Sequence, residues 1–148
     1  MSALSSIKAR LEADATLLAT ATGGIYDLTE TGRLGINRTN TPSAFDAAGV
    51  IKPCLLLRLR SATPDGVLQD DSGQYQSVRE AIEVYFYEDS GYTNIETMRS
   101  RVYTLLQATQ VAGAFAIRWA GDIRSSIDFD LNASVERSDY SVVTYRSA

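Results

Sequence analysis

Few side chains in this sequence have the chemistry of a catalytic group. Histidine is absent, which removes imidazole acid–base catalysis, nucleophile pairs that need a histidine, and histidine-ligated metals. The single cysteine, Cys54, lies in the apolar run Pro53-Cys-Leu-Leu-Leu57. We therefore expect it to be a small buried side chain rather than a reactive thiol. One cysteine also allows no intrachain disulfide and no multi-cysteine zinc site.

Two pairs of carboxylates remain as candidates for chemistry. Asp128 and Asp130 would share one face of a strand, and two such acids can serve glycoside hydrolysis. Nothing else in the sequence builds a sugar site, so an exposed strand face explains this pair better. Asp70 and Asp71 suggest calcium, but the ligand intervals and closing carboxylate of a calcium loop are missing, which favours a turn.

Motifs for phosphate loops, dinucleotide binding and HExxH zinc sites are also missing from the sequence. We therefore predict no catalytic, cofactor-binding or metal-binding residues, no cofactor, and no enzymatic activity.

Composition favours one globular domain over residues 1–148. Hydrophobic residues make up 45% and charged residues 22%, enough for a core without disulfides or metals. The net charge of −4 argues against a cationic surface that grips DNA. No apolar run reaches the roughly 18 residues of a transmembrane helix, and the N-terminus lacks the order of a signal peptide. We expect a soluble protein made in a cytoplasm, without a membrane partner.

The first elements are a helix, a short strand and a long aperiodic segment. An apolar stripe from Leu4 to Leu18 predicts one helix, capped by Ser2 or Ser5 and ending before Gly23-Gly24. Residues 25–28 read as a short strand. Residues 29–49, called the arm below, show no clear periodicity, and such long loops tend to be functional or disordered. The arm is either a contact for a partner or a mobile insertion.

Two long strands follow, with a polar connection between them over about residues 61–73. In the strand at 50–60, Leu55, Leu57 and Leu59 share one face. In the strand at 74–87, Ile82, Val84 and Phe86 should meet the helices. The other face of this strand carries amphipathic side chains suited to a subunit interface or to a plain sheet face, namely Glu83, Tyr85 and Tyr87.

The rest of the chain predicts a second helix and three strands. Thr93-x-x-Glu96 matches a capping box, and Gly113 closes the helical region. Strands are expected at 114–119, 126–132 and 139–146, with turns at Gly121-Asp122 and over 132–138. In the middle strand, the inward side chains are expected to be Ile127, Phe129 and Leu131.

Several phrases in this order resemble a known family. They are the opening Leu4-x-x-Ile7-Lys-Ala-Arg-Leu-Glu-Ala-Asp14, then Gly24-Ile-Tyr-Asp27, Ala81-Ile-Glu-Val-Tyr85 before a helix, and the terminal Tyr140-x-Val-Val-Thr-Tyr145. Together they resemble the tail-terminator and tail-completion (neck) proteins of long-tailed bacteriophages over nearly the whole chain. The arm and the residues around 120–135 depart from the compact pattern of that family.

The resemblance implies an α+β fold: a small twisted, mostly antiparallel sheet with two helices packed on one face. It implies a virion protein that forms a hexameric ring at the head-proximal end of the tail tube. Such a ring ends tube growth and joins the tail to the head connector, while DNA passes through the lumen unread. The implied partners are further copies of the chain, the tail tube protein and a head-completion protein. The alternatives are another head–tail adaptor or a non-catalytic α+β binding module.

Ring closure requires a heterologous interface, in which one patch meets a different patch on the neighbouring subunit. A charge of −4 per copy is compatible with an acidic lumen along which DNA slides, because counterion-releasing contacts would be few. We place the predicted interface in the arm, the 61–77 connection and the tyrosine face. The candidate residues are Arg33, Asn37, Arg38, Asp70, Asp71, Glu83, Tyr85 and Tyr87.

Overall fold

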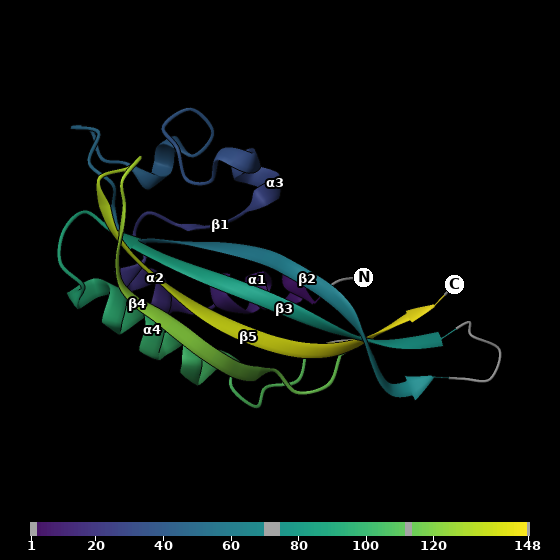
Figure 1. Cartoon of the computed structure of the whole chain (residues 1–148). Helices are drawn as coiled ribbons and strands as arrows, with labels where there is room; N and C mark the ends of the chain where they lie inside the picture. Colours follow the sequence, from purple (N-terminus) through teal and green to yellow (C-terminus); the bar gives the residue numbers. More distant parts are fainter. Residues whose placement is uncertain (1–2, 70–74, 112–113, 148) are drawn as a thin grey trace.

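The computed structural model of the chain describes residues 3–69, 75–111 and 114–147. Their centre is a five-stranded sheet of order β1-β2-β3-β5-β4, long and strongly twisted (Figure 1). Short β1 pairs in parallel with β2, and all other neighbours are antiparallel. The strands are β1 (Ile25–Asp27), β2 (Cys54–Gln69), β3 (Tyr75–Glu88), β4 (Arg118–Asp128) and β5 (Ala133–Ser147). With the helices, this confirms the predicted α+β fold with a mostly antiparallel sheet.

One face of the sheet is covered by α1 (Leu4–Glu12), α2 (Ala15–Thr20) and α4 (Thr93–Leu106) (Figure 1). The main core lies between these helices and the strands, and the predicted alternation in β2 and β3 is confirmed. Its fully buried members include Ile7, Leu11, Leu55, Leu57, Ile82, Val84, Phe86, Ile95, Met98, Val102 and Leu106. Residues two apart on a strand share a face, which is why one short apolar pattern in each strand suffices to build this layer.

The predicted single helix at the N-terminus is in fact two. The backbone breaks after Glu12, and the Asp14 side chain accepts a hydrogen bond from the backbone N–H of Leu17 at 2.8 Å, capping α2. Ser5 does not cap α1, because Ala3 is the N-cap and gives no side-chain cap, and Ser2 lies outside the described residues. A polar residue that can cap at the break overrides a continuous apolar stripe.

The arm is an ordered cover over the opposite face of the sheet at one end (Figure 1). It contains α3 (Leu28–Thr31) and two 3-10 turns, η1 (Gly32–Leu34) and η2 (Pro42–Ala44). A second core forms where apolar residues in and just after the arm meet the strands. Its buried members are Ile36, Ala44, Phe45, Ile51, Cys54, Leu56, Tyr87 and Ala133. This segment is therefore part of the fold rather than a mobile insertion.

The predicted polar connection at 61–73 is wrong for its first half. Strand β2 continues to Gln69, and its pairing with β3 includes Thr63 with Arg79 and Gln69 with Gln76, across a register shift. Residues 61–64 are exposed, so no apolar alternation marks this part of the strand. Asp70 and Asp71 lie outside the described residues.

The C-terminal half also differs from the prediction. Gly121, at φ 132°, lies within β4 at a register shift, so it is not a turn, and β5 already begins at Ala133. Residues 114–117 form only isolated bridges, and Gly113 lies outside the described residues. Phe129 and Ile127 are 87% and 54% exposed rather than inward. The alternation of apolar residues predicted the wrong burial, because β4 is an edge strand and Phe129 lies in the turn after it.

The capping box predicted for the second helix is wrong as well. Tyr92 is the N-cap of α4 and gives no side-chain cap. Instead, Glu88 at the end of β3 accepts hydrogen bonds at Oε1 from the backbone N–H groups of Asn94 (3.1 Å) and Ile95 (3.3 Å). Its Oε2 accepts from the Asn94 side chain at 3.0 Å. A buried carboxylate from a strand thus satisfies the helix N-terminus and complements its dipole.

We predict that Glu88→Ala destabilises the protein by about 2 kcal/mol, because two N–H groups of the first helical turn, that of Ile95 buried, lose their acceptor. Thr93→Ala, at the position where the sequence favoured a cap, should change stability by less than about 0.5 kcal/mol. Urea unfolding followed by circular dichroism measures both. Equal losses in the two variants would contradict this assignment of the cap.

Asp14 also ties the first two helices to α4, since Arg101 donates to it at 2.7 and 2.9 Å. The Arg101 guanidinium lowers the pKa of Asp14 from 3.8 to about 2. A carboxyl that binds its proton more weakly when folded stabilises the fold above its unfolded pKa and loses that contribution as the pH falls. The contribution is therefore complete above about pH 4 and fades towards pH 2.

We expect the stability difference between wild type and Asp14→Asn to shrink as the pH falls from about 5 to about 2. Urea midpoints across this range measure it, with the exposed Asp89→Asn as the matched carboxylate control. A difference between wild type and Asp14→Asn that stays constant with pH would show that the Arg101 contact does not set this linkage.

Candidate assembly surfaces

The groups first considered for chemistry have structural roles. Cys54 is fully buried, and burial raises the pKa of its thiol to about 12. Asp128 ends β4, where its Oδ1 accepts hydrogen bonds from the backbone N–H groups of Asp130 (3.0 Å) and Leu131 (3.1 Å). The two aspartates therefore shape a turn rather than face one another along a strand. Within residues 3–69, 75–111 and 114–147, no three potential ligands gather to hold a metal, and no helix could span a membrane.

Two of the predicted interface residues in the arm hold the arm itself together. The Asn37 amide donates to the carbonyls of Gly35 (2.7 Å) and Thr31 (3.3 Å). Arg38 donates to the carbonyl of Gly49 at 2.7 Å, and its guanidinium lies 4.8 Å from the centre of the Phe45 ring. Arg33, in η1, is exposed. Of these three residues, Arg33 is the one without a recorded internal contact in the described chain.

The tyrosine face is largely covered by the chain's own residues. Glu83 is buried, forming ion pairs with Arg137 (2.9 Å) and Arg58 (3.7 Å). Tyr87 is buried in the second core, which raises its pKa, and it stacks on half-buried Tyr85 at 6.4 Å between ring centres. Only Tyr85 of this predicted set retains partial exposure of its ring.

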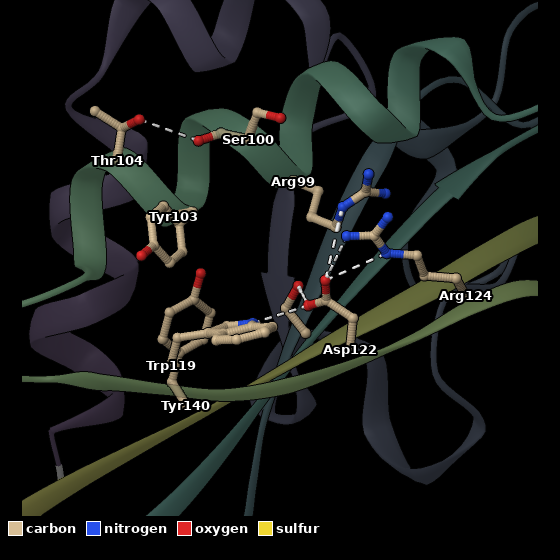
Figure 2. Close-up of a pocket in the computed structure, with 9 residues that line it drawn as sticks. Arg99, Ser100, Tyr103, Thr104, Trp119, Asp122, Arg124 and Tyr140 are labelled. Carbon is tan, nitrogen blue, oxygen red and sulfur yellow. Dashed lines mark hydrogen bonds and ion pairs between the residues drawn. The ribbon is translucent and has the colours of Figure 1, made fainter.

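A surface that the sequence did not indicate lies between α4 and the β4–β5 edge (Figure 2). It is a hollow of about 470 Å³, called the α4–β4 hollow below. Trp119 lies edge-on to Tyr103, with ring centres 6.2 Å apart, and buried Tyr140 also lines the hollow. The lining residues are Arg99, Ser100, Tyr103, Thr104, Trp119, Asp122, Arg124, Ser138 and Tyr140.

Asp122 organises the polar side of this hollow (Figure 2). It accepts hydrogen bonds from Ser138 (2.7 Å), the Trp119 indole (3.0 Å) and Arg124 (3.0 Å). Burial favours the neutral acid, but these donors hold the pKa of Asp122 below its usual value. The carboxylate thus stays ionised and fixes the indole of Trp119 in place.

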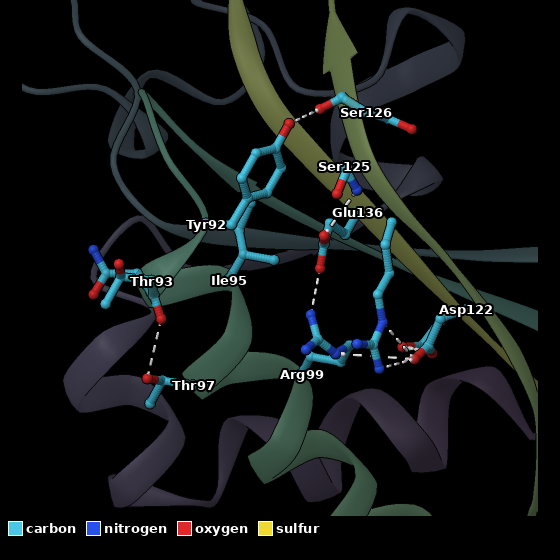
Figure 3. Close-up of polar contacts among 12 residues, drawn as sticks. Tyr92, Thr93, Ile95, Thr97, Arg99, Asp122, Ser125, Ser126 and Glu136 are labelled. Atoms are coloured by element: carbon cyan, nitrogen blue, oxygen red, sulfur yellow. Dashed lines mark hydrogen bonds and ion pairs between the residues drawn. The ribbon is translucent and has the colours of Figure 1, made fainter.

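A further set of contacts clamps β4 to α4 (Figure 3). Arg99 pairs with buried Glu136 and lies 3.9 Å from Asp122. The second oxygen of Glu136 accepts the backbone N–H of Ser125 at 2.9 Å, where the strand bulges. The Tyr92 hydroxyl donates to the carbonyl of Ser126 at 2.7 Å. The wall of the hollow is therefore held rigidly, since Asp122, Glu136 and the Tyr92 hydroxyl each have a partner.

Exposed apolar side chains gather along β4, the edge strand of the sheet. Trp119, Ile123 and Ile127 are each about half exposed, and Phe129 in the following turn is almost fully exposed. An unpaired sheet edge that also carries exposed aromatic and aliphatic side chains is the kind of surface that associates with another chain.

The comparisons bear on the fold. No protein-family model matches the chain, and no curated protein matches it. Among solved structures, it is similar to a chain described as "Virion of native gene transfer agent (GTA) particle", with a TM-score of 0.61 and 13% identity. The match covers 98% of this chain and 94% of that one. The fold is shared with a virion protein. At this identity the likeness establishes the fold alone.

We predict that Cys54 does not react with a thiol reagent in the native protein at pH 8. A pKa of about 12, against the ordinary 9.0, lowers the thiolate fraction about a thousandfold, and burial also blocks access. Labelling with 5,5′-dithiobis(2-nitrobenzoate), with and without guanidinium chloride, measures the difference. Labelling that is equally fast in native and unfolded protein would contradict the burial.

Proposed function

We propose that this chain is a structural virion protein that acts as a tail terminator at the neck of a phage-like particle. In this role it forms a ring at the head-proximal end of the tail tube, ends tube growth and joins the tail to the head connector. DNA passes through the lumen without being read. The ring, a hexamer by resemblance to the tail-terminator family, would be assembled in the host cytoplasm and carried in the virion.

The observation that carries the proposal is the end-to-end fold match to a chain from the virion of a gene transfer agent. It coincides with the resemblance in sequence pattern to neck proteins, which spans the same elements from the first helix to the last strand. The fold match supports a virion protein, and the resemblance in residue order favours a neck protein within that class.

The surfaces are compatible with ring formation. A closed ring needs two different patches on each subunit. The β4 edge offers exposed apolar side chains, with half-buried Tyr85 beside Ile123, while the arm offers exposed Arg33 as a separate patch. Asp70 and Asp71, which lie outside the described residues, remain a third candidate contact, for the tube or for a neighbouring subunit.

A head–tail adaptor is the second candidate, favoured by the ordered arm. The arm adds α3 and two 3-10 turns to one end of the sheet, beyond the compact pattern of the terminator family. An adaptor would bind the head connector through this end but would not stop the growth of the tube.

The purified protein should form rings of about six subunits, alone or after mixing with the tail tube protein of the same particle. Size-exclusion chromatography with light scattering gives the mass, and negative-stain electron microscopy shows the ring and its place at tube ends. A protein that stays monomeric and binds no tube end would contradict the terminator proposal. Binding to the connector without any effect on tube length would favour the adaptor.

A further inference from the structure

The turn between β4 and β5 presents an aromatic ring to solvent in a fixed position. Phe129 is 87% exposed and stands between two aspartates. Asp128 accepts two backbone hydrogen bonds across this turn, and the following Leu131 packs against the second core. Leaving a phenyl ring in water forgoes about 2 kcal/mol of burial, so a well-formed turn that holds it outward suggests a partner.

The α4–β4 hollow is lined by side chains suited to bind an exposed aromatic ring such as that of Phe129. Its walls are the rings of Tyr103, Trp119 and Tyr140, and about 470 Å³ is ample for a phenyl group. Arg99 and Arg124 line it beside Asp122, and Arg99 is also paired with buried Glu136, so the formal charges of these four groups cancel (2 − 2). Arg124 is 58% exposed at its side chain, so it remains accessible to a negatively charged group.

One copy of the chain cannot bring these two features together. Asp122 lines the hollow, whereas Phe129 follows the far end of the same strand, seven residues further on. Seven residues of strand span roughly 20 Å. The strand is fixed to α4 and β5 along this length, so only the turn of another copy can reach the hollow.

We propose that the Asp128–Phe129–Asp130 turn of one copy inserts into the α4–β4 hollow of the next. The phenyl ring packs against the rings of Tyr103 and Trp119, and the Asp130 carboxylate beside it faces Arg124. The contact joins two different patches, so repetition closes a ring or extends a filament. A central aromatic anchor in a pocket, bordered by complementary charge, is typical of the residues that dominate interface energies. This inference rests on the proposed ring assembly and names the contact that builds it.

The first experiment compares three variants at exposed positions. Phe129→Ser removes the anchor, Ser100→Arg obstructs the hollow, and Tyr145→Ser removes an exposed aromatic side chain near the far end of β5. Sedimentation velocity should show association weakened about thirtyfold or more for the first two variants and unchanged for Tyr145→Ser. A mixture of Phe129→Ser and Ser100→Arg should form dimers but no rings, because the pair retains one intact turn and one intact hollow. Rings of Phe129→Ser as stable as those of wild type would overturn the inference while leaving the proposed function standing.

The second experiment detects the contact between turn and hollow even if rings form only in the presence of the tail tube. Asp130→Cys protein is mixed with Ser100→Cys protein and oxidised, while buried Cys54 stays unreactive. We expect a disulfide-linked heterodimer well above the level given by Asp130→Cys with Thr39→Cys, an exposed position in the arm. Crosslinking no greater than in that control would overturn the inference. A clear crosslink in a protein that never binds tube ends would support the contact and contradict the terminator role.

Discussion

The structure depends on three central strands that bury both of their faces at the same end. On one face Leu55, Leu57 and Phe86 meet the helices, and on the other Cys54, Leu56 and Tyr87 meet the arm. A sheet that is apolar on both sides must be covered on both sides, or it would associate with other chains. The helical layer and the arm are therefore two covers of one sheet. Away from the arm, the second face carries ion pairs such as Arg58 with Glu83 and stays partly open to solvent.

This arrangement explains why the strands could be predicted from the sequence and the arm could not. The buried face of β3 could be predicted from Ile82, Val84 and Phe86, because the alternation of apolar residues is a local pattern within one strand. The arm was not readable, because its few apolar residues, among them Ile36 and Phe45, are buried only by strands that lie elsewhere in the chain. The cap of α4 was missed for a similar reason: Glu88 lies on the preceding strand, outside the local capping pattern.

The candidate surface was the least predictable part. Strict alternation placed Phe129 and Ile127 inside, but alternation tells which side chains share a face and not whether anything covers that face. The residues that build the hollow, such as Arg99 and Asp122, come from α4 and β4 and meet only in the folded chain. Several residues predicted as interface from the aperiodic arm and the tyrosine face, notably Asn37 and Glu83, are occupied by internal contacts. The edge strand thus concentrates exposed apolar groups that suit the proposed contact between subunits.

The most direct test of the account is cryo-electron microscopy of particles purified from cells that encode this chain. The account predicts a closed ring of this fold at the head-proximal end of the tail tube, coaxial with the DNA channel. Within that ring, each β4–β5 turn should approach α4 of the neighbouring subunit. Particles that lack the chain, or that carry its fold only in the capsid shell, would contradict the central claim.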